Sequence, residues 1–363
     1  MAISRRDFVG RAGTAAILGS VARRSSPIAQ SDEPQQTSGV WIDGLSGTRL
    51  GPEGLAEIAK SGLTVMETTL GPAGNPTFSY EAAVQDLAEW HGNFARYSDK
   101  LLHIKRSADI LQAKREGKMG VLLGFQNATH LNRDIRNVDF FYNLGIRQMQ
   151  LTYNELNALG AGSTERKDVG LSDFGVAVVE RMNEIGMLVD VSHTGVQSTL
   201  DAIEVSKKPI LFSHSNCRAL NDNPRCKTDE QIRKLAAKGG VMGITTVNFF
   251  VSKKPRSTLD DYIAHIEHVA KLVGIDHVGI GTDSSIGGWR IDFPDEKTFR
   301  DFHAQFKYKP GVDLRWPPFI EEIDVPDKMY IIQKRLASKG FSSTDIDKIL
   351  GGNFFRVYKE IIG

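Results

Sequence analysis

Cysteine is almost absent from this 363-residue sequence, which contains only two. Cys217 and Cys226 lie nine positions apart in one predicted loop. So few cysteines exclude a disulfide-rich scaffold, and this spacing is not that of a cysteine zinc site. An oxidising compartment would allow the two thiols to form a disulfide, and the sequence leaves open whether they do.

An excess of charge of one sign is also missing, as are long hydrophobic runs. The formal net charge is +1 and no basic stripe carries interleaved aromatics, so nothing indicates nucleic-acid binding. Apart from a weak run near the N-terminus, no apolar stretch approaches the roughly 18 residues needed to span a membrane. No GxGxxG motif opens the first helix, which argues against a nucleotide-binding fold.

Eight short apolar runs alternate with stretches of helical periodicity. The runs predict strands at 40–45, 63–70, 120–126, 146–154, 188–193, 210–214, 240–248 and 277–284. Helices are predicted at 52–61, 80–97, 107–116, 137–145, 172–186, 194–208, 229–238, 258–273, 327–338 and 344–361. Eight such units favour an α/β fold of the (β/α)8 TIM barrel type, and the alternative is an open doubly wound sheet.

Two segments fall outside this alternation. Residues 1–37 contain Arg5 and Arg6 in SRRDFVG, then a mildly apolar run at 12–21, which resembles a twin-arginine export signal followed by a linker. We therefore expect a periplasmic protein with one barrel domain at 38–363. Within it, residues 285–325 form a predicted long loop, and loops of this length commonly cover a site.

Two histidines stand at the carboxyl ends of neighbouring predicted strands. LVDVSH ends at His193 and ILFSH ends at His214, with one helix between them. The carboxyl ends of parallel strands are where α/β folds place their active sites. Neutral imidazoles at that edge suit a divalent metal such as zinc.

Other polar side chains at the strand ends are expected to share this mouth. Asp283, at the end of GIGTDS, is the best candidate for a general base, and the alternative is a turn cap. His130 lies just past the third predicted strand and could also reach the mouth, whereas His265 is expected on the surface. The remaining candidates are Asp43, Glu67, Gln126, Tyr153, Asn154 and Asn248.

Longer motifs surround these residues: IGMLVDVSH, PILFSHSNCRAL, NPR, TDEQIR, GGVMGI and DHVGIGTD. Together they resemble the membrane (renal-type) dipeptidase family, peptidase family M19 of the amidohydrolase superfamily. The resemblance extends from about residue 40 to residue 363. It implies a (β/α)8 barrel, a two-zinc site and hydrolysis of dipeptides whose free carboxylate is held by an arginine, here Arg225.

The sequence departs from the family pattern at four positions. The family's first strand ends in a His-x-Asp pair, where Leu45 and Gly47 stand here. Gln126 replaces the bridging glutamate, and Tyr153 replaces a substrate-contacting histidine. A two-zinc site therefore cannot be carried over intact, and we expect at most one zinc ion.

The sequence thus favours an exported mononuclear metallohydrolase that cleaves a small amide, either a dipeptide or an N-acyl amino acid. Two alternatives stay open: a dipeptidase-like binding protein without catalysis, and a lyase or isomerase on the same barrel. The expected partner is a small molecule with a carboxylate, and a homodimer is left open. The candidate residues are Asp283 for catalysis, Arg225, Tyr153 and Asn154 for substrate binding, and His193, His214 and Gln126 for metal binding.

Overall fold

The structure is a computed structural model that describes residues 39–47, 50–71, 78–291, 293–304 and 314–363. The predicted export signal and linker at 1–37 lie outside the described residues. Within the described ranges, no helix combines the length and the apolar character that a membrane crossing requires.

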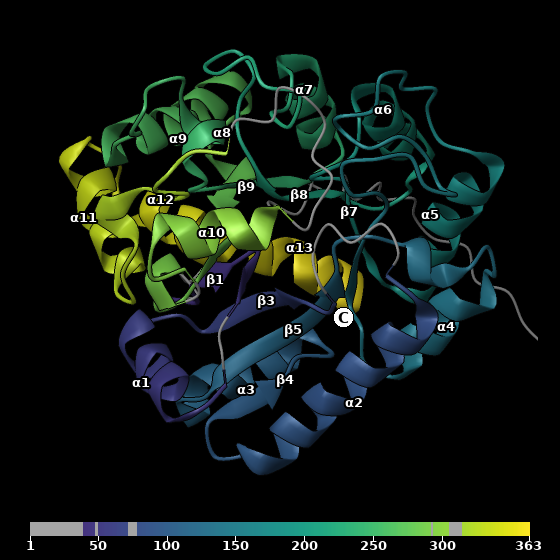
Figure 1. The fold of residues 1–363 in the computed structure, drawn as a ribbon, viewed down its shortest axis with the longest axis horizontal. Coiled ribbons are helices and arrows are strands. Elements are labelled where there is room, and N and C mark those ends of the chain that lie inside the picture. Colours follow the sequence, from purple (N-terminus) through teal and green to yellow (C-terminus); the bar gives the residue numbers. More distant parts are fainter. Residues whose placement is uncertain (1–38, 48–49, 72–77, 292, 305–313) are drawn as a thin grey trace, which may run out of the picture. The chain divides into compact units, whose positions relative to one another are not determined.

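Eight parallel strands of the described chain close into a barrel (Figure 1). Strand β1 pairs with β3 on one side and β10 on the other, and the pairing of β3 with β5 completes the ring. The barrel strands are β1 (Ile42–Asp43), β3 (Val65–Thr69), β5 (Met119–Phe125), β6 (Gln148–Gln150), β7 (Leu188–Asp190), β8 (Leu211–Ser215), β9 (Val241–Ile244) and β10 (Val278–Ile280). The predicted (β/α)8 barrel is confirmed.

Helices surround the barrel because each connects two parallel strands and buries its apolar face against them (Figure 1). Several begin at a hydroxyl side chain that accepts a hydrogen bond from the first turn, as Ser172 does from the N–H of Gly175. Thr228 and Thr258 act in the same way. The helices between strands include α1 (Pro52–Ser61), α2 (Tyr80–Arg96), α3 (Ser107–Glu116), α4 (Arg136–Asn143), α5 (Asp173–Ile185), α6 (Val196–Val205), α7 (Asp229–Ala237), α8 (Asn248–Val251) and α9 (Leu259–Val273).

Some strands are shorter than predicted, and three short ones were not predicted. The runs at 151–154 and 245–247 leave the barrel as loops, so β6 and β9 end early. Strand β4 (Leu101–His103) pairs with the first residues of β5. Strands β2 (Ser46–Gly47) and β11 (Ser284–Ser285) join the segments that follow β1 and β10.

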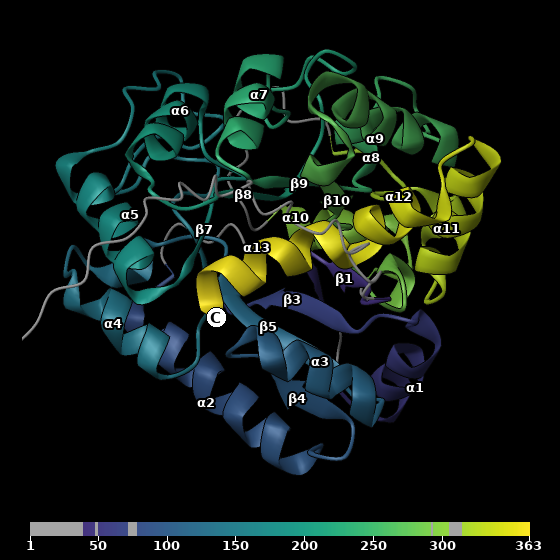
Figure 2. The same cartoon turned by 180° about the vertical axis from the view of Figure 1, so that it is seen from behind.

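The predicted C-terminal helix is broken into three parts. These are α12 (Ser343–Asp347), the π-helical turn η5 (Lys348–Gly352) and α13 (Asn353–Ile362). Gly351 leaves helical geometry and lies so close to the carbonyl of Val40 that a Cβ would collide with it. Beyond the break, α13 crosses one end of the barrel, where Phe354 and Tyr358 are fully buried (Figure 2).

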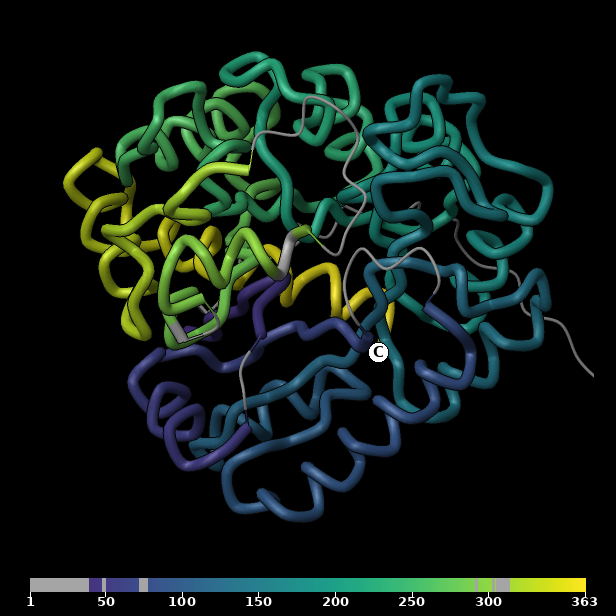
Figure 3. The backbone as a smooth tube through the Cα atoms, viewed as in Figure 1, coloured from purple at the N-terminus to yellow at the C-terminus, as the bar shows by residue number. Residues whose placement is uncertain are grey.

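The segment predicted as a long loop is partly helical in its described residues. It contains η3 (Trp289–Ile291), α10 (Glu296–His303) and η4 (Glu321–Ile323), and α11 (Lys328–Ser338) follows it. The chain leaves the barrel after β10 and returns to it, as the path in Figure 3 shows. On its return Phe319 pairs with Val247 just beyond β9, so the segment is anchored at the carboxyl ends of the strands.

Candidate active site

A bulge in β8 aims the second histidine. His214 lies within β8, whereas His193 follows β7 by three residues. In the bulge, Ser213 and His214 together oppose the single residue Gly243 of β9. Bulges redirect side chains in this way. The carbonyl of Ser213 turns toward Gly243 and Gly281, where a Cβ would collide with it.

The two imidazoles meet through their Nε2 atoms, which are 2.9 Å apart. Nδ1 of His193 lies 2.8 Å from the amide oxygen of Asn154. Because that oxygen only accepts hydrogen bonds, His193 carries its proton on Nδ1. Nδ1 of His214 lies 2.7 Å from the hydroxyl of Ser213, which itself donates to Asp190 at 2.6 Å. His214 therefore also carries its proton on Nδ1, and both Nε2 atoms present lone pairs.

Two lone pairs that face each other repel unless a cation binds them. Burial, reinforced by the charge of Arg225, lowers the pKa of both His193 and His214 well below the usual value, so neither ring supplies a proton at neutral pH. Neutral imidazole nitrogens are ligands that zinc prefers. The pair fits a divalent ion, although no third His, Cys, Asp or Glu among the described residues completes a metal-binding cluster.

Tyr153 and Gln126 come from the ends of β6 and β5. The ring of Tyr153 stacks on that of His193, with centroids 4.0 Å apart and planes 18° apart. The backbone N–H of Gln126 donates to Thr69 and its carbonyl accepts from Gln150. Among the described residues, no hydrogen bond joins the side-chain amide of Gln126 to either histidine. Tyr153 thus contacts the pair directly, and Gln126 lies at the end of the neighbouring strand.

Arg225 is buried beneath both histidine segments. Its Nη1 donates to the carbonyl of Ser192 and the hydroxyl of Ser215, and its Nη2 donates to the carbonyl of His214. Its Nε has no hydrogen-bond partner among the described residues. A buried donor without a partner is costly, so Nε is available to bind a ligand.

Asp283 lies just beyond β10, with φ of +58°. Burial raises the pKa of its carboxyl group to about 7, and the nearby charge of Arg225 opposes this shift. Its N–H donates to the carbonyl of Leu45 at 2.8 Å. Leu45 therefore lies beside this candidate base and Gly47 pairs with Ser285, and neither offers a side chain that can bind a metal ion.

Two side chains expected at the mouth, those of Asp43 and Asn248, bind other parts of the chain, and a third, that of Glu67, is buried. The carboxylate of Asp43 accepts from the N–H and the hydroxyl of Thr282. The amide of Asn248 donates to the carbonyl of Pro317 and so holds the returning segment. Glu67 is buried, and burial together with the charges of neighbouring carboxylates raises its pKa well above the usual value.

Asp190 and the serines around it are the site residues that the sequence reasoning missed. The Asp190 carboxylate accepts four hydrogen bonds, from the N–H and the hydroxyl of both Ser192 and Ser213. The available indication was that a serine directly precedes each histidine. Lys227 was also missed, and its buried ammonium group donates to the carbonyls of Val191 and Thr194 in the loop that contains His193.

His265 was wrongly expected on the surface. It is fully buried, accepts from the N–H of Cys217 and donates to the carbonyl of Val251, so it fixes the loop after β8. In that loop Cys217 and Cys226 are both buried free thiols and form no disulfide.

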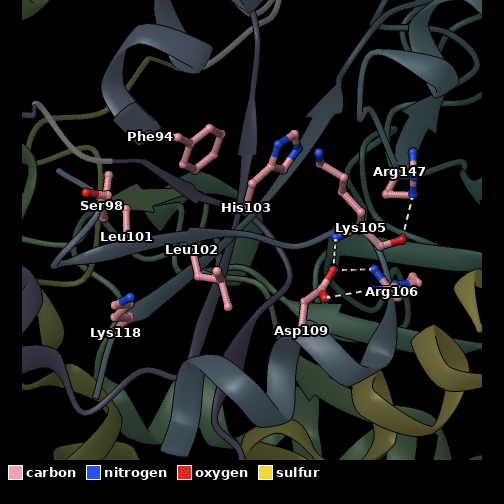
Figure 4. Close-up of a pocket in the computed structure, with 10 residues that line it drawn as sticks. All are labelled: Phe94, Ser98, Leu101, Leu102, His103, Lys105, Arg106, Asp109, Lys118 and Arg147. Atoms are coloured by element: carbon pink, nitrogen blue, oxygen red, sulfur yellow. Dashed lines mark hydrogen bonds and ion pairs between the residues drawn. The ribbon is translucent and has the colours of Figure 1, made fainter. Parts of the chain in front are cut away.

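A hollow of about 680 Å³ lies at the amino ends of β5 and β6, away from His193 and His214 (Figure 4). Four basic side chains line it, but most have partners. Arg147 donates to three backbone carbonyls, Arg106 lies 3.9 Å from Asp109, and Lys118 pairs with Glu116 at 2.7 Å. The chemistry-bearing residues of the barrel are therefore at its opposite end.

Comparison with known proteins identifies the family of this chain. Residues 62–313 match the membrane dipeptidase family, peptidase family M19. The dipeptidase verJ of Clonostachys rogersoniana is 34% identical over 211 residues, which are 56% of this chain and 53% of that protein. The dipeptidase tcpJ of Claviceps purpurea is 26% identical over 268 residues, 73% of this chain and 56% of that protein. This chain spans about half the length of these curated relatives.

Solved structures share the fold. A crystal structure of an amidohydrolase from Pseudomonas aeruginosa is 30% identical, with a TM-score of 0.81 over 90% of this chain and 98% of that chain. A metallo peptidase from Rhodobacter sphaeroides, solved with a phosphinate mimic of the dipeptide L-Ala-D-Ala, has a TM-score of 0.73 at 15% identity and covers 89% of this chain and 99% of its own. The family match spans most of the barrel, and the chain belongs to the membrane dipeptidase family, peptidase family M19.

Proposed function

We propose that this protein is an exported metal-dependent hydrolase that cleaves a small amide, either a dipeptide or an N-acyl amino acid. Membership of the dipeptidase family supports the reaction class. The observation that carries the proposal is the pair of Nε2 atoms of His193 and His214, 2.9 Å apart. Their lone pairs are available because both Nδ1 atoms are bound elsewhere.

The proposed metal is a single zinc ion held by His193 and His214. Gln126, at the end of β5, is proposed as a neutral third ligand. When bound, the ion would lower the pKa of a water molecule and polarise the amide carbonyl of the substrate. At most one ion is proposed, because Leu45 and Gly47 provide no ligand for a second.

The proposed substrate carries a carboxylate that binds Arg225. The guanidinium already uses Nη1 and one donor of Nη2 on the protein, while Nε is buried without a partner. Nε and Nη2 lie on one edge of the guanidinium plane and can meet a carboxylate with two parallel hydrogen bonds. Tyr153, stacked on His193, offers an aromatic surface beside the histidines, and Asn154 orients His193 through Nδ1.

Asp283 is the proposed proton acceptor. Its pKa of about 7 suits a group that must take up a proton and release it again near neutral pH. The proton accepted from the attacking water would pass to the leaving nitrogen. The φ of +58° places this residue in a sparsely populated region, a strain that is found often at active sites.

The proposed compartment is the periplasm, reached by the twin-arginine pathway. The support is the sequence Arg5-Arg6 followed by a mildly apolar run. Replacing both arginines with lysine should keep the protein in the cytoplasm, which cell fractionation would detect.

One experiment tests the main proposal. Natively exported protein would be analysed for metal content and then incubated with dipeptides and N-acyl amino acids, with and without added zinc. One zinc ion per chain and release of both amide halves would support hydrolysis. Dipeptide binding without metal or turnover would instead support a binding protein. The observation in favour of this second candidate is that the described chain has no third His, Cys, Asp or Glu beside the pair.

A further inference from the structure

The two candidate ligands are oriented by groups of different charge. His193 donates from Nδ1 to the neutral amide of Asn154. His214 donates to Ser213, whose hydroxyl lies 2.6 Å from the carboxylate of Asp190. Within the described residues, Asp190 is thus a carboxylate that hydrogen bonds through Ser213 connect to the imidazole pair.

The direction of this chain of hydrogen bonds is fixed at the carboxylate. Asp190 is surrounded by four donors, so the hydroxyl protons of Ser192 and Ser213 both point toward it. The hydroxyl of Ser213 can then only accept from His214, which places the imidazole proton on Nδ1. Reversal of this order would put the proton on Nε2 and remove the lone pair that faces His193.

We propose that Asp190, acting through Ser213, is a positioning residue that holds His214 in the Nδ1–H form and supplies negative charge to the metal site. Such charge matters in this chain because the third ligand proposed, Gln126, is neutral, and no third His, Cys, Asp or Glu of the described chain completes the site. A carboxylate that does not itself bind the metal but orients a metal-binding histidine also makes the ring nitrogen a stronger ligand for the metal. The supply of charge rests on the proposed metal site. The control of the His214 tautomer concerns the protein without metal and is independent of that site.

Asp190→Asn tests both parts. The new amide NH₂ would donate to Ser213, which would then donate to Nδ1 of His214 and drive the proton to Nε2. We expect zinc affinity, measured by competition with a chelator, to fall about 10- to 100-fold. Ser213→Ala should weaken affinity in the same direction, and the two changes combined should cost less than the sum of the single losses, because they act through one chain of hydrogen bonds.

Asp43→Asn is the matched control. Asp43 is also buried and also accepts from a backbone N–H and a hydroxyl, both of Thr282, but within the described ranges no hydrogen bond connects it to His193 or His214. It should leave zinc affinity unchanged even if it lowers the unfolding temperature. An equal loss of affinity in the control would overturn the proposal.

The tautomer can be read without metal. In ¹⁵N-histidine-labelled protein, the nitrogen chemical shifts of His214 should indicate Nδ1–H in the parent and Nε2–H in Asp190→Asn. An unchanged tautomer in the folded variant would refute the role of Asp190. A changed tautomer in a protein that binds no zinc would keep that role and refute the proposed metal site instead.

Discussion

Arg225 donates from Nη2 to the carbonyl of His214 at 2.8 Å, and from Nη1 to the carbonyl just before His193. One guanidinium thus connects the two segments that carry the candidate ligands. The same group leaves its Nε buried and without a partner among the described residues. Arg225 can therefore affect both the geometry of the histidines and the binding of substrate, and a suitable pair of substrates separates these effects.

Arg225→Lys should reduce kcat/KM about 10- to 150-fold, because a hydrogen bond to a charged group contributes about 1.5–3 kcal/mol and lysine cannot form the parallel pair. The control is a substrate whose C-terminal carboxylate is replaced by a carboxamide. The parent should discriminate between the two substrates and the variant should not. An equal loss on both substrates would indicate that Arg225 only supports the histidine segments.

Asp283→Asn should lower turnover about 10²- to 10⁴-fold, the usual contribution of a positioned proton acceptor. Asparagine tolerates the left-handed backbone at φ +58° as well as aspartate does, so the fold should persist. Circular dichroism and zinc affinity serve as controls and should match those of the parent. Full activity in this variant would make Asp283 a turn residue and require another base.

The barrel was predictable because its strands are buried on both faces and therefore appear as continuous apolar runs. Strand β4 was missed because three residues beside charged neighbours give no such run. The break at Gly351 was missed because it depends on the approach of Val40, which is distant in sequence. Helical periodicity does not predict such a contact between residues that are distant in sequence.

The histidine pair was predictable from its place at the strand ends, but its supporting groups were not. Asp190 is the last residue of β7 and lies inside an apolar run, and its role depends on the hydroxyl directions of Ser192 and Ser213. Asn154 was assigned to substrate, whereas the structure brings it to Nδ1 of His193. Side-chain direction in a bulge or loop follows from tertiary contacts, which strand position alone does not specify.

His130, considered for the mouth, is instead enclosed by Phe78, Phe125 and Phe141. Among the described residues, neither ring nitrogen has a hydrogen-bond partner, and the nearby backbone of Asn127 opposes the effect of burial only in part. Burial therefore lowers the pKa of His130 from 6.5 to about 3. The folded state keeps this ring neutral, whereas the unfolded chain takes up a proton below about pH 6.5.

His130→Phe should consequently reduce the loss of stability in acid. From pH 7 to pH 5, protonation of His130 in the unfolded chain should lower the free energy of unfolding of the parent by about 2 kcal/mol. The phenylalanine variant should lack this part of the decrease. Urea unfolding of both proteins at the two pH values gives the comparison. The contributions of the other buried histidines to the pH dependence are the same in both proteins and cancel in the difference. An identical decrease in both would mean that His130 titrates normally.

Gln126→Glu should tighten zinc binding, because an anionic oxygen would replace a neutral one at the same reach. We expect at least about a tenfold gain in affinity, measured by chelator competition. Gln126→Met is a control of similar size that removes the oxygen, and it should weaken binding or leave it unchanged. If the glutamate variant binds zinc no better than the parent, position 126 does not reach the ion.

Adding Leu45→His and Gly47→Asp to Gln126→Glu should create a second metal site. The two positions correspond to the family's His-x-Asp pair, and the carbonyl of Leu45 already lies 2.8 Å from the N–H of Asp283. A Cβ at position 47 meets no atom within 4 Å, so an aspartate has room there. Elemental analysis should find two zinc ions per chain in the triple variant and one in the parent.

The double variant without Gln126→Glu should stay near one ion, because two cations close together repel unless a carboxylate bridges them. Two ions in the parent itself would contradict the proposal that Leu45 and Gly47 limit the site to one.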